Sequence, residues 1–218
     1  MKDKFWKNKR ILITGYEGFL GSHLTRSLLN NHARVWGLDI KTHRKDTILS
    51  GEERGKMTII KGNVENLSLL TGIIKKQNIK FIFHLAARAL VGRCLENPLR
   101  AFSTNIKGTW NILEAARCNK GIKSVVVASS DKAYGDQVRL PYRETFPLVG
   151  RHPYDVSKSC ADLLAYTYFH TYNLSVCVTR CGNIFGPGDF NFSRIIPDTI
   201  RAAIKNKKLI IRSDGKFI

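Results

Sequence analysis

The sequence is short of acidic residues and lacks several patterns that define whole classes of protein. Its 17 Asp and Glu stand against 36 Lys and Arg, which gives a formal net charge of +19. It has no internal repeat, no low-complexity tract and no linker rich in Ser, Pro or Gly. With 218 residues, 43% of them hydrophobic, the chain is long enough to bury a sizeable core. Disorder and a repeat architecture are therefore excluded. The positive charge favours nucleic acid, an anionic membrane or a phosphorylated small ligand as partner.

Paired cysteines and long apolar runs are also missing. The five cysteines form no CxxC motif and are odd in number, so they predict neither a disulfide framework nor a metal site. We interpret them as reduced thiols in the core; they are Cys94, Cys118, Cys160, Cys177 and Cys181. No apolar run approaches the roughly 20 residues that cross a bilayer, and residues 1–10 lack the apolar stretch of a signal peptide. We therefore expect a cytoplasmic protein.

Short β-rich runs alternate with longer stretches of helical period. The expected strands are Ile11–Thr14, Arg34–Leu38, Met57–Ile60, Phe81–Leu85, Val125–Ser129 and Ser175–Thr179. The expected helices are Gly18–Asn31, Ser68–Asn78, Pro98–Asn119, Pro153–Tyr172 and Arg194–Asn206. Runs such as Val125-Val126-Val127 are apolar throughout, as burial on both faces requires. The sequence predicts an α/β fold with a doubly wound parallel sheet, the Rossmann arrangement, whose ligands bind beyond the carboxyl ends of the strands.

One polar segment, residues 41–56, carries charges of both signs. Such mixed charge is typical of a solvated surface. We therefore expect a surface loop with a short helix there.

A glycine-rich loop follows the first expected strand. Gly15, Gly18 and Gly21 have the spacing GxxGxxG and open the first expected helix. At this place Gly15 permits a tight turn, Gly18 lets backbone N–H groups approach a pyrophosphate, and Gly21 allows helix and strand to pack closely. The sequence therefore predicts a dinucleotide-binding loop.

A carboxylate follows the second expected strand, about twenty residues after that loop. Asp39 stands where an acidic side chain accepts the ribose hydroxyls of an adenosine, which favours NAD. Lys41, His43 and Arg44 follow closely and are suited to a 2′-phosphate instead. At this point NADP stays open as an alternative.

Two further groups have the chemistry of an active site. Ser130, Asp131 and Lys132 follow the fifth expected strand, while Tyr154 and Lys158 are four residues apart on an expected helix. An ammonium one helical turn away would lower the pKa of the phenol from about 10 towards a value useful for a base. A salt bridge between Asp131 and Lys132 is the structural alternative for that pair.

These features together resemble the extended short-chain dehydrogenase/reductase family of nucleotide-sugar epimerases and dehydratases. The resemblance covers essentially the whole chain and rests on Gly15 to Gly21, Asp39, His84-Leu85-Ala86-Ala87, Ser130, Tyr154 and Lys158, in that order. Ser130-Asp131-Lys132 is similar to the dehydratase branch. Phe5-Trp6 and Arg194-Ile195-Ile196-Pro197-Asp198 resemble the CDP-glucose 4,6-dehydratases within it. The resemblance implies an NAD-dependent lyase that forms a 4-keto-6-deoxy sugar nucleotide.

The resemblance also implies roles for individual residues. Tyr154 would remove the proton of the sugar 4-hydroxyl with help from Lys158 and Ser130, Asp131 would protonate the leaving 6-hydroxyl, and Lys132 would take the C5 proton. Ser130, Asn183 and Arg194 would contact substrate, with Arg93 as a further charged contact. The implied cofactor contacts are Gly15, Gly18, Phe19, Leu20, Gly21, Asp39, Ile40, Asn63, Val64, Leu85, Ala86, Ala87, Ser129, Tyr154 and Lys158.

The resemblance bears on organisation as well. It implies an NAD-binding Rossmann domain over residues 1–180 and the start of a substrate-binding region over residues 181–218, with that region incomplete. Family members commonly pair through the helices expected at Pro98–Asn119 and Pro153–Tyr172, so we expect a homodimer with a nucleotide-sugar substrate and neither nucleic acid nor membrane as partner. The alternatives are a nucleotide-sugar 4-epimerase and a catalytically idle protein that binds NAD or RNA.

Overall fold

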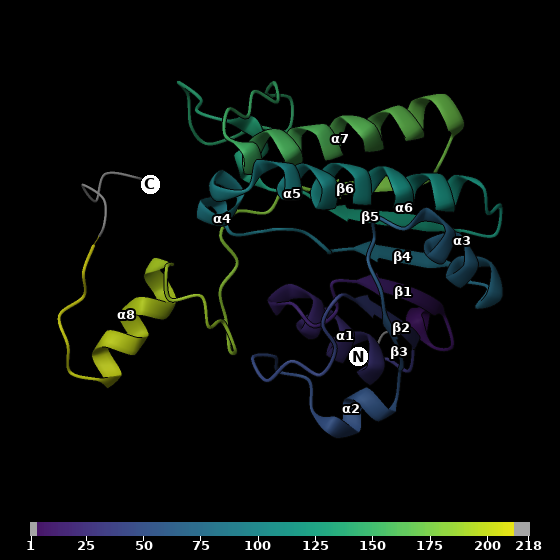
Figure 1. The fold of residues 1–218 in the computed structure, drawn as a ribbon, viewed down its shortest axis with the longest axis horizontal. Coiled ribbons are helices and arrows are strands. Elements are labelled where there is room, and N and C mark those ends of the chain that lie inside the picture. The colour runs from purple at the N-terminus through teal and green to yellow at the C-terminus, as the bar shows by residue number, and fades with distance from the viewer. Residues whose placement is uncertain (1–3, 212–218) are drawn as a thin grey trace.

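The computed structural model describes residues 4–211, and its centre is a six-stranded sheet (Figure 1). All neighbouring strands are parallel, and their order is β3-β2-β1-β4-β5-β6. The strands are β1 (Arg10–Thr14), β2 (Arg34–Asp39), β3 (Thr58–Lys61), β4 (Phe81–His84), β5 (Ser124–Ala128) and β6 (Val176–Thr179). This order reverses direction between β1 and β4, which places the topological switch point at the carboxyl ends of those two strands. The predicted Rossmann fold is confirmed.

Helices cover both faces of the sheet. The longer ones are α1 (Phe19–Asn30), α3 (Leu67–Lys76), α6 (Gly108–Arg117), α7 (Pro153–Tyr172) and α8 (Ile195–Ile204). The shorter ones are η1 (Lys4–Trp6), α2 (Gly51–Gly55), α4 (Val91–Glu96), α5 (Pro98–Phe102), the π-helical turn η2 (Ser103–Lys107) and the 3-10 turn η3 (Asp131–Tyr134). In Figure 1, α3, α6 and α7 lie on one side of the sheet and α1 on the other, while α8 stands apart from it.

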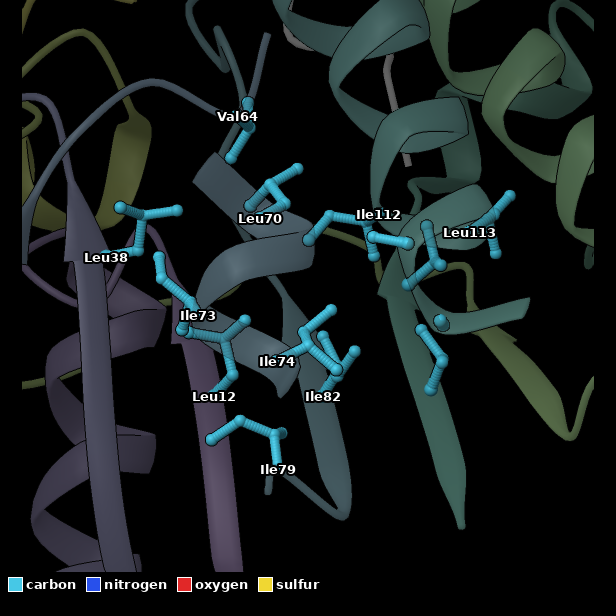
Figure 2. Close-up of a cluster of buried hydrophobic side chains, with 14 of the residues drawn as sticks. Leu12, Leu38, Val64, Leu70, Ile73, Ile74, Ile79, Ile82, Ile112 and Leu113 are labelled. Carbon is cyan, nitrogen blue, oxygen red and sulfur yellow. The ribbon is translucent and has the colours of Figure 1, made fainter. Parts of the chain in front are cut away.

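Two clusters of apolar side chains join these layers. Leu12 and Ile82 point from the central strands toward α3 and α6, where Ile73, Ile74, Ile112 and Leu113 meet them (Figure 2). Val125 of β5 and Ala165 of α7 belong to the same cluster. Their neighbours Ile11, Ile13 and Val35 point to the other face, against Leu28 of α1. Because successive residues of a strand face opposite sides, burial of both sets explains why these strands are apolar throughout.

The helix predicted over residues 98–119 is interrupted by a π-helical turn, which the helical period of the sequence did not reveal. Residues 98–117 run through α5, the π-helical turn η2 and α6. Asn105, inside the π-turn, is buried and bonds with both backbone groups of Arg88 and with the Ser157 hydroxyl. A π-turn places one extra residue in the helix and is frequent near functional sites. The sequence analysis also missed α4.

The segment 41–56 is less free than its composition suggested. The expected short helix is present as α2, with a capping box between Ser50 and Glu53. However, Leu49 is only 4% exposed, and two ion pairs fasten the segment to the rest of the domain. The segment is therefore the expected surface loop with a short helix, and Leu49 and the two ion pairs anchor it.

The cysteines also need a correction. All five are free thiols, as expected, but only Cys94 is buried, whereas Cys118 and Cys177 are exposed. Cys177 lies on the edge strand β6, and Cys118 directly follows α6. Among the residues described, no helix is both long and apolar enough to cross a membrane.

Candidate active site

A cleft of about 2120 Å³ opens at the carboxyl ends of the strands. It lies beyond β1 and β4, as expected for a doubly wound sheet. Every residue that the sequence analysis assigned to cofactor, substrate or chemistry lines it: Gly15, Gly18, Phe19, Leu20, Gly21, Asp39, Ile40, Asn63, Val64, Leu85, Ala86, Ala87, Ser129, Ser130, Asp131, Lys132, Tyr154, Lys158, Asn183 and Arg194. The fold therefore brings these distant segments to one place.

The glycine loop connects the end of β1 to the start of α1. Gly15 has a φ of +75°, and a Cβ there would lie 2.7 Å from the backbone nitrogen of Ala86. A Cβ on Gly21 would lie 2.1 Å from the carbonyl oxygen of Gly15. Gly18 is the N-cap of α1 and brings no side chain to compete for the first N–H groups of the helix. The loop therefore fits a diphosphate group in shape and in donors.

Asp39 stands at the carboxyl end of β2. Its Oδ1 accepts a hydrogen bond from the backbone N–H of Lys41 at 3.2 Å, and its Oδ2 accepts one from the N–H of Glu17 at 3.4 Å. Burial raises the pKa of Asp39, and these N–H groups act in the opposite direction. The carboxylate is thus held at the edge of the cleft where a ribose would lie.

The turn after β5 carries three polar side chains. The Ser130 hydroxyl donates to Oδ1 of Asp131 at 2.8 Å, and the backbone N–H of Lys132 donates to Ser130 Oγ at 3.3 Å. The backbone N–H of Asp131 donates to the carbonyl of Cys181 at 3.0 Å, which ties the turn to the chain after β6. Within residues 4–211, Asp131 and Lys132 form no ion pair with each other. The structural alternative considered for this pair is therefore not what the turn shows.

Tyr154 and Lys158 lie one turn apart on α7. The Lys158 ammonium is 5.9 Å from the centre of the Tyr154 ring and donates a 2.7 Å hydrogen bond to the carbonyl of Ala128. Burial raises the pKa of Tyr154, against the effect of the neighbouring Ser130 hydroxyl. Burial also lowers the pKa of Lys158 to about 8. The expected lowering of the Tyr154 pKa is therefore not found in this state, because loss of water around the phenol outweighs the hydrogen bond from Ser130.

A chain of buried hydrogen bonds, which the sequence did not predict, connects the glycine loop to α7. Oγ1 of Thr14 lies 2.8 Å from Nδ1 of His84, and Nε2 of His84 lies 3.2 Å from Oγ1 of Thr109. Thr109 donates its hydroxyl hydrogen to the Asn105 carbonyl and can only accept from His84. His84 must therefore donate from Nε2 and accept at Nδ1. Burial lowers the pKa of His84 to about 3, which keeps the ring neutral.

The chain of hydrogen bonds continues from η2 into α7. The side-chain amide of Asn105 donates to Ser157 Oγ at 2.9 Å, and Ser157 donates to the carbonyl of Tyr154 at 2.6 Å. Asn105 thereby supports the helix that carries Tyr154. Its only signal in the sequence is the segment Thr104-Asn105-Ile106-Lys107-Gly108-Thr109, which resembles the same family.

Arg194 stands at the N-cap of α8 and closes a surface strap, residues 182–194, onto itself. Its guanidinium donates to the carbonyl of Ile184 at 3.0 Å and lies 3.6 Å from Oδ2 of Asp189. Asn183 of the same strap and Arg93 of α4 are exposed and line the cleft. Their positions in the lining would let them contact an anionic substrate in the cleft.

Sequence comparison relates the chain to enzymes of known activity. The sequence model of the NAD dependent epimerase/dehydratase family matches residues 11–218. CDP-glucose 4,6-dehydratase of Salmonella typhimurium is 33% identical over 228 residues, covering 98% of this chain and 63% of the relative. The chain therefore spans less than two thirds of the length of that relative.

Solved structures agree in fold. DesIV, a dTDP-glucose 4,6-dehydratase from Streptomyces venezuelae with NAD bound, has a TM-score of 0.83 at 30% identity, covering 94% of this chain and 65% of that chain. A UDP-N-acetylglucosamine 4-epimerase from Methanobrevibacter ruminantium has a TM-score of 0.87 at 29% identity, covering 96% of this chain and 67% of that chain. Dehydratases and epimerases are thus about equally similar in fold.

The cofactor prediction is confirmed as NAD. The family is NAD-dependent and a structural neighbour holds NAD, while the glycine loop and Asp39 of this chain have the geometry that such a group needs. From its parallel sheet, its cleft and a match over nearly its whole length, we conclude that the chain belongs to the NAD dependent epimerase/dehydratase family.

Proposed function

We propose that this chain supplies the NAD-binding and catalytic part of a nucleotide-sugar 4,6-dehydratase. The observation that carries the proposal is the turn after β5, where a carboxyl group and an amine, Asp131 and Lys132, directly follow Ser130 in the cleft that Tyr154 also lines. A dehydratase needs an acid and a base beyond the oxidation machinery, whereas a 4-epimerase does not.

In the part of the cleft that would hold NAD, the glycine loop would bind the diphosphate and Asp39 the adenosine ribose. NAD, when bound, supplies the acceptor and later the donor of hydride. Ala86 and Ala87 follow β4 at the switch point and, with Ser129, would form the wall along the cofactor. These roles are proposed from position in the cleft.

Tyr154 is proposed to take the proton of the sugar 4-hydroxyl. Its raised pKa means that the phenol holds its proton in this state, so substrate binding must bring a change that favours the phenolate. Lys158 would favour the phenolate by turning its ammonium group from the Ala128 carbonyl toward the phenol and the ribose. Ser130 would release Asp131 and donate to the 4-oxygen, where charge develops.

Elimination would then use the rest of the turn. Asp131 is proposed to protonate the 6-hydroxyl as it leaves, and Lys132 to remove the C5 proton made acidic by the 4-ketone. Lys132 is exposed, and it needs to lose its proton before it can act as a base. Closure of substrate over it would remove water and favour the neutral amine.

The proposed substrate is CDP-glucose, supported by the similarity to the Salmonella enzyme. Asn183 and Arg194 would bind its diphosphate. We further propose residues 1–180 as the NAD-binding domain and residues 181–218 as the start of the substrate region, because residues 181–185 and 193–197 line the cleft. Residues 1–3 and 212–218 of these two regions lie outside the described residues.

A homodimer is the proposed assembly. The neighbouring helices α6 and α7 expose large apolar side chains, among them Trp110, Leu163, Tyr166 and Phe169. A second copy of the same pair of helices would cover them. Analytical ultracentrifugation should give twice the chain mass, and a monomer at micromolar concentration would contradict the proposal.

The second candidate is a nucleotide-sugar 4-epimerase, favoured by the fold match to the Methanobrevibacter enzyme. The chain is incubated with NAD and, separately, with CDP-glucose, dTDP-glucose, UDP-N-acetylglucosamine and GDP-mannose. Mass spectrometry should show loss of one water from CDP-glucose. An isomer of unchanged mass would support the epimerase, and NAD binding with no conversion of any donor would support an idle cofactor-binding protein.

A further inference from the structure

A charged pair lies behind the cofactor site, between the glycine loop and α2. Glu17 occupies the second variable position of the loop, and its side chain is 0% exposed. Arg54 of α2 donates to it from Nε at 3.3 Å and from Nη2 at 3.1 Å, and its side chain is 14% exposed. Burial alone would raise the pKa of Glu17, but the hydrogen bonds from Arg54 and from the His43 backbone N–H outweigh it and lower the pKa. Glu17 is therefore a buried carboxylate.

The same two side chains hold the backbone of the segment after β2. Oε1 of Glu17 accepts the N–H of His43 at 2.8 Å, and Nη2 of Arg54 donates to the carbonyl of Arg44 at 3.0 Å. His43 has a φ of +59°, in the left-handed region that a residue with a side chain rarely adopts. A turn of this kind persists when its surroundings hold it. Glu17 and Arg54 supply two of the contacts that do so.

The segment after β2 lines the cleft, whereas Glu17 and Arg54, which hold it, do not. Ile40, Lys41, Arg44 and Asp46 line the cleft beside Asp39, whereas Glu17 and Arg54 are absent from its lining. Glu17 also donates its own backbone N–H to Asp39. One buried residue thus connects the diphosphate loop, the ribose carboxylate and the segment that follows it.

We propose that Glu17 and Arg54 form a positioning pair, which fixes residues 41–46 in the shape that receives the adenosine half of NAD. The inference rests on the cofactor site of the proposed function and not on the dehydration itself. Neither Glu17 nor Arg54 lines the cleft. It acts through the backbone of residues 43 and 44, and its effect is therefore expected on binding of the adenosine half.

A second ion pair on α2 provides a matched control. Glu53 accepts from Arg26 of α1 at 2.6 Å and 3.0 Å, and Arg26 also bonds with the carbonyl of Ile48. Neither Arg26 nor Glu53 lines the cleft. This pair fastens the same helix to α1 without touching residues 41–46. Removing this ion pair shows how much affinity is lost when α2 is held less firmly but residues 41–46 keep their contacts.

The experiment measures the Kd of ADP-ribose, which lacks the nicotinamide, by isothermal titration calorimetry. Since Arg54→Met alone leaves Glu17 buried without a cation, the main variant is the double change Glu17→Gln/Arg54→Met, in which both partners are neutral. The control is Arg26→Met/Glu53→Gln, and Arg54→Lys tests partial rescue. Thermal unfolding and amide hydrogen exchange at His43 are recorded for each variant.

We expect Glu17→Gln/Arg54→Met to raise the Kd of ADP-ribose by about tenfold and to speed exchange of the His43 amide, since misplacement of a binding segment costs affinity. Arg54→Lys should fall between that variant and the wild type. The control should change the Kd less than twofold even where its melting temperature falls.

Equal Kd values for the wild type and Glu17→Gln/Arg54→Met, or an equal rise in the control, would overturn the inference. Failure of the wild type to bind ADP-ribose would overturn the cofactor site and this inference together. Binding with no loss of water from any sugar nucleotide would contradict only the proposed dehydration.

Discussion

The ammonium group of Lys158 donates a 2.7 Å hydrogen bond to the carbonyl oxygen of Ala128, the last residue of β5. The bond fastens the start of α7 to the strand end from which Ser129 and Ser130 continue. It places a buried amine beside Tyr154, and burial lowers the pKa of that amine to about 8. Lys158 therefore holds together the two segments that carry Ser130 and Tyr154.

The lowered pKa of Lys158 predicts a pH dependence of stability. Between about pH 8 and the ordinary lysine pKa of 10.5, the unfolded chain binds more protons here than the folded chain does, so stability rises with pH. Relative to Lys158→Met, the wild type should gain about 3 kcal/mol of unfolding free energy across this interval. Urea unfolding at a series of pH values measures it, and parallel curves for the two proteins would contradict the assigned pKa.

His84 is predicted to stay neutral with its hydrogen on Nε2. Thr109 cannot donate to it, because its hydroxyl hydrogen is used by Asn105, and burial lowers the pKa of His84 to about 3. Nitrogen NMR of the imidazole should show a protonated Nε2 and no titration between pH 8 and 5. Because the folded pKa lies below the ordinary 6.5, this group should also lower stability as the pH falls from 6.5 toward 3. A titration midpoint of His84 near pH 6.5, or a hydrogen on its Nδ1, would contradict the buried series of hydrogen bonds from Thr14 to Thr109.

Gly21 is predicted to tolerate no side chain. The Cβ of Gly21→Ala would lie 2.1 Å from the Gly15 carbonyl oxygen, so α1 and the glycine loop must separate. Overpacking of this kind costs about 1–3 kcal/mol, so NAD affinity should fall about 5- to 150-fold if the cost is borne on binding. Gly72→Ala, in α3 with no atom near its Cβ, is the matched control and should stabilise by about 0.5–1 kcal/mol. Normal NAD affinity in Gly21→Ala would contradict the proposed loop geometry.

Asp39 is predicted to select the cofactor. Asp39→Asn removes a charged acceptor for the ribose hydroxyls and leaves Arg44 and Lys41 nearby. A hydrogen bond to a charged group is worth about 1.5–3 kcal/mol, so the affinity for NAD should fall about tenfold or more. The affinity for NADP should fall less, because the repulsion of its 2′-phosphate is lost as well. An unchanged ratio of the two Kd values would exclude Asp39 from the ribose site.

The sequence predicted elements whose signal is local. Apolar runs gave the six strands within a few residues, and the spacing of Gly15, Gly18 and Gly21 predicted a loop whose close approaches the structure contains. Parallel topology then brings Ser130 and Tyr154 to the same cleft, because strand ends meet at one edge of the sheet.

Features set by tertiary contacts escaped the sequence. The pairing of Glu17 with Arg54 joins residues 37 positions apart, and nothing in the composition of segment 41–56 indicates it. The π-turn depends on the contacts of Asn105 with Arg88 and Ser157. Burial raises the pKa of Tyr154 more than the Ser130 hydroxyl lowers it, and the spacing of residues along a helix does not reveal that burial.

Water loss from CDP-glucose, compared between the wild type and Asp131→Asn, tests the central claim most directly. Both proteins are loaded with NAD, and titration calorimetry first shows that each binds it equally. The account predicts that Asp131→Asn slows the loss of 18 mass units at least about 100-fold, since general acid catalysis contributes at least that much. Conversion to an isomer of unchanged mass, at the same rate in both proteins, would contradict the dehydratase and establish an epimerase.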